Sequence, residues 1–312
     1  MTMSIEVSNS RVQGRGDPGA DRFAAADGTR LALFSAGAPT PGLTYLFAHG
    51  WTLDHRSWED VVAQLGEAEP DAAIVTYDHR GHGQSDRLPR GTGTLERLAD
   101  DLAQILTDRV SGPVVLAGHS MGGMTLAALG ERHPELVRER VVGAAFIATS
   151  AGPFFPRLRT RPYFLDEVIP RYFTWAESAA NRRGSDRAAR IQARMTLFGR
   201  DARRGDIDRA LAQTRAAGPG ATLEFGLSMS AHLRLDELTP FARIPVAVLA
   251  GEHDRLCPVR HSAALARALP QSALTVFSGA GHMLPYERSA EVVGRLRSVR
   301  RRAALARSEE SR

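Results

Sequence analysis

The chain has 312 residues, of which 43% are hydrophobic, so it is long enough for one large folded domain and too apolar for a disordered chain. Its net charge of +5 comes from 40 basic residues, all arginine and scattered among 35 acidic ones, which argues against a nucleic-acid partner. No apolar run is long enough to cross a membrane, and the single Cys257 excludes an internal disulfide framework. Residues 1–20 have no apolar secretion core, so we expect a flexible leader, no membrane insertion and a cytoplasmic location.

Short apolar runs alternate with amphipathic segments of helical length along most of the chain. This alternation is typical of a mostly parallel sheet with helices on both faces, so the sequence predicts an α/β fold. Asp27-Gly28 indicates a turn between the first two strands, and Thr94 is the expected N-cap of the second helix. The predicted strands are residues 22–25, 31–34, 44–48, 73–77, 113–117, 141–149, 245–250 and 273–277. The predicted helices are residues 57–66, 95–109, 121–132, 259–268 and 287–306.

The alternation stops in the third quarter of the chain. Residues 151–239 contain no clear strand and several helix-like runs rich in arginine, alanine and aromatic residues. We interpret this stretch as a helical cap inserted after the sixth strand. Residues 21–150 and 240–307 then form the α/β core.

A nucleophile motif, Gly118-His119-Ser120-Met121-Gly122, lies between a predicted buried strand and a predicted helix. The pattern alone is a weak signal, because a chain of this length can contain it by chance. A strand directly before it and a helix directly after it indicate a nucleophile elbow. Such a turn has a strained backbone, and its glycines avoid collisions with neighbouring elements. The turn would raise the Ser120 hydroxyl above the sheet and place the N–H of Met121 at a helix N-terminus, where it can stabilise an oxyanion.

A candidate acid and a candidate base follow the last two predicted strands. A serine hydroxyl needs a base to accept its proton, and with an elbow of this kind the usual chain order is serine, carboxylate, histidine. Asp254 and the competing acid Glu252 follow one strand, and His282 lies in a glycine-rich loop after the next. We favour Asp254 as the acid. Because the carboxyl ends of parallel strands share one edge, Ser120, Asp254 and His282 are expected to meet there.

A second oxyanion donor is expected from the loop His49-Gly50-Trp51, which follows the third predicted strand. The backbone N–H of Trp51 is the candidate, and the alternative is that Trp51 only packs against the pocket wall. Together with Met121 it would give two amides facing the developing negative charge.

With these motifs the chain resembles the α/β-hydrolase superfamily, in its serine-nucleophile, esterase-like branch with a helical cap. The matching pieces are the His49-Gly50 loop, residues 78–86, the elbow at 118–123, Asp254 and His282. The resemblance implies a sheet of about eight strands, a water-excluding pocket beneath the cap, no cofactor, and a mainly structural role for residues 78–86.

Several residues narrow the choice within that family. Epoxide hydrolases and haloalkane dehalogenases have aspartate at the nucleophile position, where this chain has Ser120. Some members place the acid after the sixth strand, but this chain reads Thr149-Ser150-Ala151-Gly152 there, which supports Asp254. His79 and His82 have the spacing of metal ligands, but no third ligand is evident, so no metal is expected.

Aromatic residues concentrate in the predicted cap and indicate the kind of substrate. The candidate pocket residues are His49, Phe154, Phe155, Tyr172 and Trp175. A pocket lined in this way favours an apolar small molecule, although the same aromatics would also suit the core of the cap itself.

The expected function is hydrolysis of a carboxylic ester, lactone or thioester through an acyl-enzyme. The alternative on the same triad is C–C bond hydrolysis or a tailoring step on a natural product. Non-catalytic binding of a small molecule is the third hypothesis. The sequence leaves the oligomeric state open.

Overall fold

A computed structural model describes residues 20–38, 41–152 and 186–310, and within them the chain forms a single eight-stranded sheet. The strands are β1 (Asp21–Ala24), β2 (Arg30–Gly37), β3 (Thr44–Ala48), β4 (Ala73–Tyr77), β5 (Val114–His119), β6 (Val141–Ile147), β7 (Val246–Gly251) and β8 (Ser272–Phe277). Their order is β1-β2-β4-β3-β5-β6-β7-β8. β2 is antiparallel to β1 and β4, and all other neighbouring pairs are parallel. The predicted mostly parallel sheet of eight strands is confirmed.

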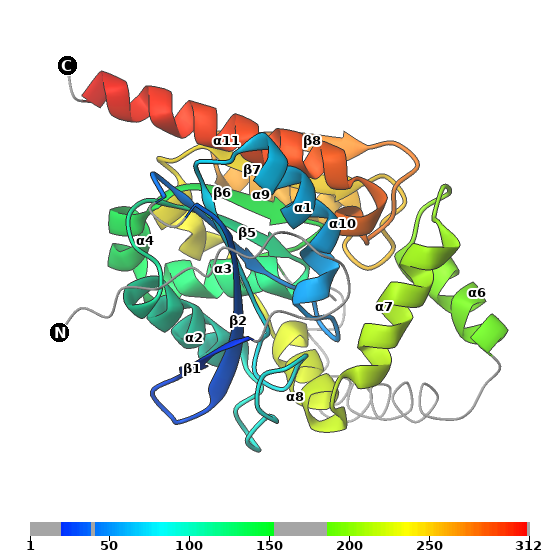
Figure 1. Ribbon diagram of the computed structural model, residues 1–312. Helices are drawn as coiled ribbons and strands as arrows, with labels where there is room; N and C mark the ends of the chain where they lie inside the picture. The colour runs from blue at the N-terminus through cyan, green and yellow to red at the C-terminus, as the bar shows by residue number, and fades with distance from the viewer. Residues whose placement is uncertain (1–19, 39–40, 153–185, 311–312) are drawn as a thin grey trace.

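Helices cover both faces of this sheet (Figure 1). On one face, α1 (Glu59–Ala68) packs beside α11 (Ser289–Glu310). The helices on the other face are α2 (Leu95–Asp108), α3 (Met121–Arg132), α4 (Pro134–Arg140) and α9 (Val259–Ala268). The predicted N-cap is confirmed, because the Thr94 side chain accepts a hydrogen bond from the N–H of Arg97 at 3.2 Å.

Side chains alternate between the two faces along the buried strands. On β3, Tyr45 and Phe47 pack in the apolar cluster beneath α1 and α11. Leu46 and Ala48 pack in the cluster on the side of α2 and α3. Both faces are therefore apolar, as expected for a parallel sheet enclosed by helices.

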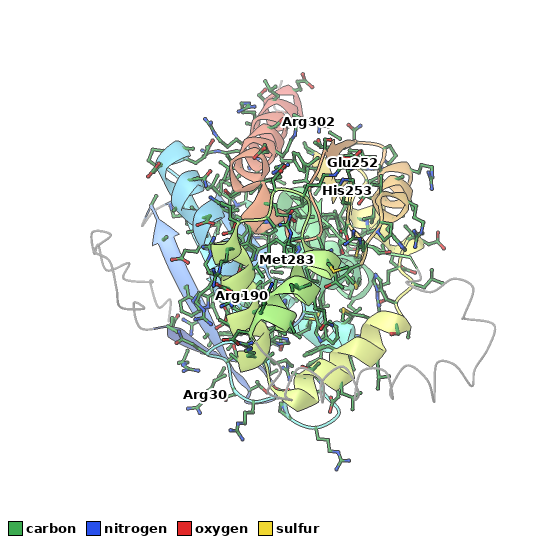
Figure 2. The ribbon with its side chains drawn as sticks, turned by 90° about the vertical axis from the view of Figure 1, so that its right-hand side faces the viewer. Arg30, Arg190, Glu252, His253, Met283 and Arg302 are labelled. Atoms are coloured by element: carbon green, nitrogen blue, oxygen red, sulfur yellow. The ribbon has the colours of Figure 1, made fainter. Side chains whose placement is uncertain are left out.

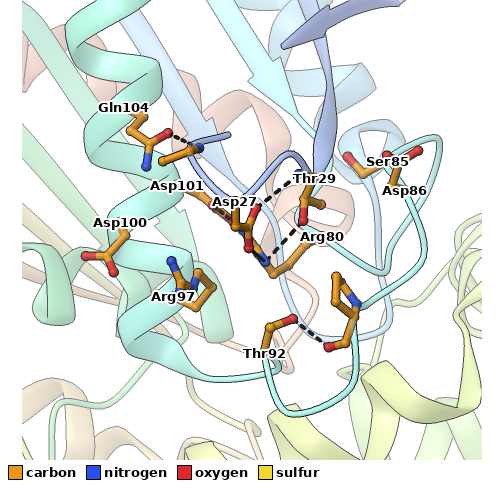
Figure 3. A network of polar contacts seen from close by, with 12 residues as sticks. Asp27, Thr29, Arg80, Ser85, Asp86, Thr92, Arg97, Asp100, Asp101 and Gln104 are labelled. Carbon is orange, nitrogen blue, oxygen red and sulfur yellow. Dashed lines mark hydrogen bonds and ion pairs between the residues drawn. The ribbon is translucent and has the colours of Figure 1, made fainter. Parts of the chain in front are cut away.

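Arg80 connects the turn of the β1–β2 hairpin to α2 (Figure 3). The Arg80 side chain is fully buried and donates two hydrogen bonds, of 2.7 and 2.6 Å, to the Asp101 carboxylate on α2. It donates a third, of 2.7 Å, to Asp27 in the hairpin turn. This network fixes the beginning of the long loop after β4 to the hairpin turn and to α2.

Between β6 and β7, the described residues form helices and no strand. These elements are α6 (Asp186–Leu197), α7 (Arg204–Ala216), α8 (Pro219–Ser230) and the 3-10 helix η3 (Asp236–Phe241). α6 and α7 lie beyond the edge of the sheet to which the parallel strands point (Figure 1). The predicted limits of a cap at 151–239 stay a prediction, since residues 153–185 lie outside the described part. None of the described helices combines the length and apolar character that a membrane crossing requires.

Candidate active site

Ser120 occupies a strained turn between β5 and α3. Its backbone has φ 52° and ψ −117°, a conformation that costs energy for a residue with a side chain. The Ser120 N–H donates to the carbonyl of Ile147 at 2.9 Å. Its carbonyl accepts from the N–H of Met124 at 3.1 Å and from the Thr149 hydroxyl at 2.7 Å. Neighbouring strands and the first turn of α3 thus hold the predicted elbow in place.

The elbow also depends on a close approach at Gly122. A Cβ atom added there would lie 2.1 Å from the carbonyl oxygen of Ala48 at the end of β3. Only glycine therefore lets α3 begin against the loop that carries Trp51. Because Met121 is the first residue of α3, its N–H has no acceptor within the helix.

The three predicted catalytic side chains are brought together at the carboxyl edge of the sheet. His282 Nε2 lies 3.0 Å from the Ser120 Oγ, and His282 Nδ1 lies 2.8 Å from Asp254 Oδ2. Since a carboxylate only accepts, Nδ1 carries the proton and Nε2 is free to accept the hydroxyl proton. All three residues are buried. This arrangement can activate a serine hydroxyl for attack on a carbonyl carbon.

Asp254, not Glu252, is the carboxylate that faces the histidine. Its second oxygen accepts from the N–H groups of Leu256 at 2.9 Å and Cys257 at 2.7 Å. Burial alone would raise the pKa of Asp254, but the His282 imidazole and these amides outweigh it and hold the pKa below its ordinary value. Asp254 therefore stays ionised beside the His282 imidazole.

Glu252 points elsewhere. Its carboxylate accepts from the Ser278 hydroxyl at 3.0 Å and from the N–H of Gly279 at 2.9 Å. Figure 2 shows Glu252 near the upper edge of the molecule, whereas Met283, the neighbour of His282, lies close to its middle. The competing acid is thus separated from the triad.

The loop that carries Trp51 is held by three histidines. The His49 ring accepts from the N–H of His79 at 2.9 Å and donates to the carbonyl of Gly50 at 2.8 Å. The His79 ring donates to the carbonyl of His49 at 3.1 Å, and the His82 ring accepts from the N–H of Thr52 at 3.2 Å. These rings support the loop, which gives a structural reason for the histidine spacing noted in the sequence.

The position of His49 corrects one prediction. Its ring is fully buried, and both of its nitrogens are bound to backbone groups. The side chain therefore cannot offer a polar atom to a substrate, and it supports the loop that carries Trp51 instead of lining a pocket. The other pocket candidates, Phe154, Phe155, Tyr172 and Trp175, lie outside the described residues.

His119 is a contributor that the sequence did not reveal. Its ring donates through Nε2 to the carbonyl oxygen of His282 at 2.9 Å, and the two rings lie 5.0 Å apart. Burial lowers the pKa of His119 to about 3, so the ring is neutral in the folded protein. His119 thus fixes the backbone of His282, and only its place next to Ser120 in the elbow motif could have indicated this.

Two groups of side chains in the described residues gather atoms of the metal-ligating type within 4.8 Å of one another. One is Asp254, Cys257 and His282, in which the carboxylate and the imidazole already bind each other. The other is Asp54, His55 and Asp78, in which His55 is bound to Asp78 at 2.8 Å and Asp54 to Arg56. In each group the imidazole is already bound to a carboxylate, so we assign no metal to either.

Comparisons with known proteins agree with this fold. Residues 46–289 match the family model described as alpha/beta hydrolase fold. The chain is 28% identical over 258 residues to a non-heme chloroperoxidase of Kitasatospora aureofaciens, covering 77% of this chain and 85% of that protein. It is 26% identical over 245 residues to a pimeloyl-(acyl-carrier protein) methyl ester esterase of Pseudoalteromonas atlantica, covering 77% and 88%. A thermophilic esterase from Thermogutta terrifontis superposes with a TM-score of 0.73 at 26% identity, covering 91% and 99% of the two chains.

The fold and these relatives define a hydrolytic enzyme built on an α/β sheet. The chain belongs to the alpha/beta hydrolase fold family.

Proposed function

We propose that this hydrolase cleaves carboxylic esters of apolar small molecules through an acyl-enzyme on Ser120. The observation that carries the proposal is the continuous hydrogen-bond chain from the Ser120 hydroxyl through His282 to Asp254. Two of the relatives described above are esterases, which supports an ester as the substrate class. Lactones and thioesters are the next substrate classes to consider, because their carbonyl carbons react in the same way.

In the proposed reaction, Ser120 Oγ attacks the ester carbonyl carbon while His282 Nε2 accepts the hydroxyl proton. The oxyanion that forms is stabilised by the backbone N–H groups of Met121 and Trp51. His282 then gives its proton to the leaving alcohol as the C–O bond breaks. Water attacks the acyl-enzyme in the same manner, which releases the acid and restores Ser120. Asp254 keeps Nδ1 protonated and balances the charge of the imidazolium.

The test is a series of p-nitrophenyl esters of increasing acyl length, assayed with the wild type, Ser120→Ala and Ser278→Ala. Ser278 is an exposed hydroxyl in the same loop as His282 and serves as the matched control. We expect kcat to fall by about 10⁴- to 10⁶-fold in Ser120→Ala. Ser278→Ala should behave as the wild type, and kcat/KM should increase with acyl length if the substrate is apolar.

Labelling of Ser120 by a fluorophosphonate separates the mechanism from the substrate. If the wild type is labelled but hydrolyses no ester, lactone or thioester, the same triad acts on another bond, and C–C bond hydrolysis becomes the better hypothesis. Full ester hydrolysis by Ser120→Ala would refute the proposed mechanism.

A further inference from the structure

A carboxylate that the proposed reaction does not use lies beside the loop that carries His282. Glu287 is the last residue of the short helix α10 (Leu284–Glu287) and is half-buried. Its oxygens accept from the N–H of Gly281 at 3.1 and 3.0 Å and from the N–H of Met283 at 3.1 Å. These two residues flank His282 in the chain. One side chain therefore holds the backbone on both sides of the base.

The same carboxylate also binds the segment inserted between β6 and β7. The N–H of Gly199, just after α6, donates to Oε2 at 2.7 Å. Leu197, the last residue of α6, accepts a hydrogen bond from the N–H of His282 itself at 2.7 Å. The two backbones are in contact here, because a Cβ atom added to Gly281 would lie 2.4 Å from the carbonyl carbon of Phe198. The insertion and the base are thus bound to each other directly.

The chemistry of this position requires a carboxylate. Burial raises the pKa of Glu287 above its ordinary value, although the three amides act in the opposite direction. An ionised carboxylate has two oxygens that accept several hydrogen bonds, whereas a glutamine side chain has one accepting oxygen and a leucine side chain has none. The three donors that converge on Glu287 are fully satisfied only by the native residue.

We propose that Glu287 is a positioning residue, which sets the His282 imidazole at proton-transfer distance from Ser120 and aligns its loop with the inserted segment. Glu287 acts through the backbone and touches none of the reacting atoms. The inference rests on the proposed function, since it concerns the base of that reaction. A displacement on the order of 1 Å, caused by a change away from the chemistry, can cost about 100-fold in rate.

The test compares Glu287→Gln and Glu287→Leu with the wild type and Ser120→Ala. Glu291→Gln is the matched control, because Glu291 is an exposed carboxylate in the first turn of α11, and its Arg288 ion pair is long at 3.8 Å. Two readouts are measured well below each unfolding temperature: kcat and KM on a p-nitrophenyl ester, and the rate constant for labelling of Ser120 by a fluorophosphonate. Circular dichroism reports the folded fraction of each variant.

We expect kcat to fall about 10-fold in Glu287→Gln and about 100-fold in Glu287→Leu, with KM changed less than about threefold. The labelling rate should fall in the same order, and Glu291→Gln should match the wild type. The partial activity of Glu287→Gln, the conservative variant, distinguishes positioning from a purely structural role.

Folded Glu287→Leu with the kcat and labelling rate of the wild type would overturn the inference, as would losses that only follow the unfolded fraction. If Glu287→Leu does not fold, Glu287→Gln decides by the same criteria. If the wild type is labelled but does not hydrolyse esters, the proposed substrate class is refuted. The labelling rates of the Glu287 variants still test the positioning role in that case. A wild type that is neither labelled nor active refutes both proposals.

Discussion

The imidazole of His82 accepts a hydrogen bond from the N–H of Thr52, 3.2 Å away, while its other ring nitrogen donates to the carbonyl of Arg80 at 3.1 Å. Thr52 has a φ of 59° and directly follows Trp51, the proposed oxyanion donor. Burial lowers the pKa of His82 to about 3, so the ring that supports this loop is neutral. The loop that carries Trp51 therefore depends on an imidazole that does not take up a proton.

A dependence of stability on pH follows from these buried histidines. His82 and His119 have a lowered pKa of about 3 in the folded protein, so below the ordinary histidine value the unfolded chain binds protons that the folded chain does not. Above about pH 6.5 neither histidine lowers the free energy of unfolding, because both states are then unprotonated. As the pH falls from there toward 3, each histidine lowers the free energy of unfolding by about 1.4 kcal/mol per pH unit. The raised pKa values of Asp101 and Glu287 act in the opposite direction.

Urea unfolding of the wild type and His82→Gln between pH 4 and pH 6 measures this effect. Glutamine can still accept from Thr52 but does not titrate, so the slope of unfolding free energy against pH should decrease by about 1.4 kcal/mol per pH unit. An unchanged slope would show that His82 titrates alike in the folded and unfolded chain.

The acid of the triad can be tested with two similar substitutions. Asp254→Asn removes the charge that balances the His282 imidazolium and destabilises its productive tautomer, so kcat should fall by about 10⁴-fold. Ser120→Ala should lose at least as much. Glu252→Gln should keep nearly full activity, because Glu252 is bound to Ser278 and Gly279 instead of the base. A larger loss in Glu252→Gln than in Asp254→Asn would reverse the assignment.

Glycine 122 should tolerate no side chain. In Gly122→Ala the new Cβ atom would meet the Ala48 carbonyl oxygen at 2.1 Å, so we expect a loss of more than about 4 kcal/mol or no soluble protein. Gly294→Ala is the control: this residue lies within α11, and its added Cβ atom would have no neighbour within 4 Å. Thermal unfolding should show that Gly294→Ala gains up to about 1 kcal/mol. Equal stability of the two variants would contradict this prediction.

The Arg80 network should contribute more to stability than a surface ion pair. Asp101→Asn leaves the buried guanidinium without its bidentate partner and should cost about 3–5 kcal/mol. Glu135→Gln removes an ion pair with Arg138, of which both side chains are at least half exposed, and should cost less than about 1 kcal/mol. Chemical denaturation at neutral pH measures both. A cost below about 1 kcal/mol for Asp101→Asn would show that Asp27 alone satisfies Arg80.

Much of the fold could be predicted because its signals are local. The strand before Ser120 is a continuous apolar run, and the helix after it begins at the motif itself, so the elbow was placed correctly. Asp254 and His282 each follow a strand of the same kind, and parallel strands bring their ends to one edge whatever the loops between them do. The sheet, and the edge at which its parallel strands end, could therefore be predicted without knowledge of distant contacts.

Other features depend on contacts that a single sequence does not display. Helix α4 was missed because its seven residues are too few to show a periodic apolar pattern, although Pro134 at its first position was a usable signal. His49 was placed in the pocket because its loop was correctly identified, but its ring turns toward the backbone of His79. The hydrogen bond between Leu197 and His282 joins residues that are 85 positions apart in the chain, and no sequence pattern in either segment predicts it.

The contact between the end of α6 and the histidine loop limits how this enzyme could be redesigned. If α6 and the residues before it were exchanged for those of a relative, a junction placed after Gly199 would remove the residues that bond to His282 and Glu287. A graft that retains residues 197–199 and replaces only the residues before them would keep the hydrogen bonds that hold the His282 loop. Residues 197–199 therefore have to be kept together with the loop that carries His282 in any such exchange.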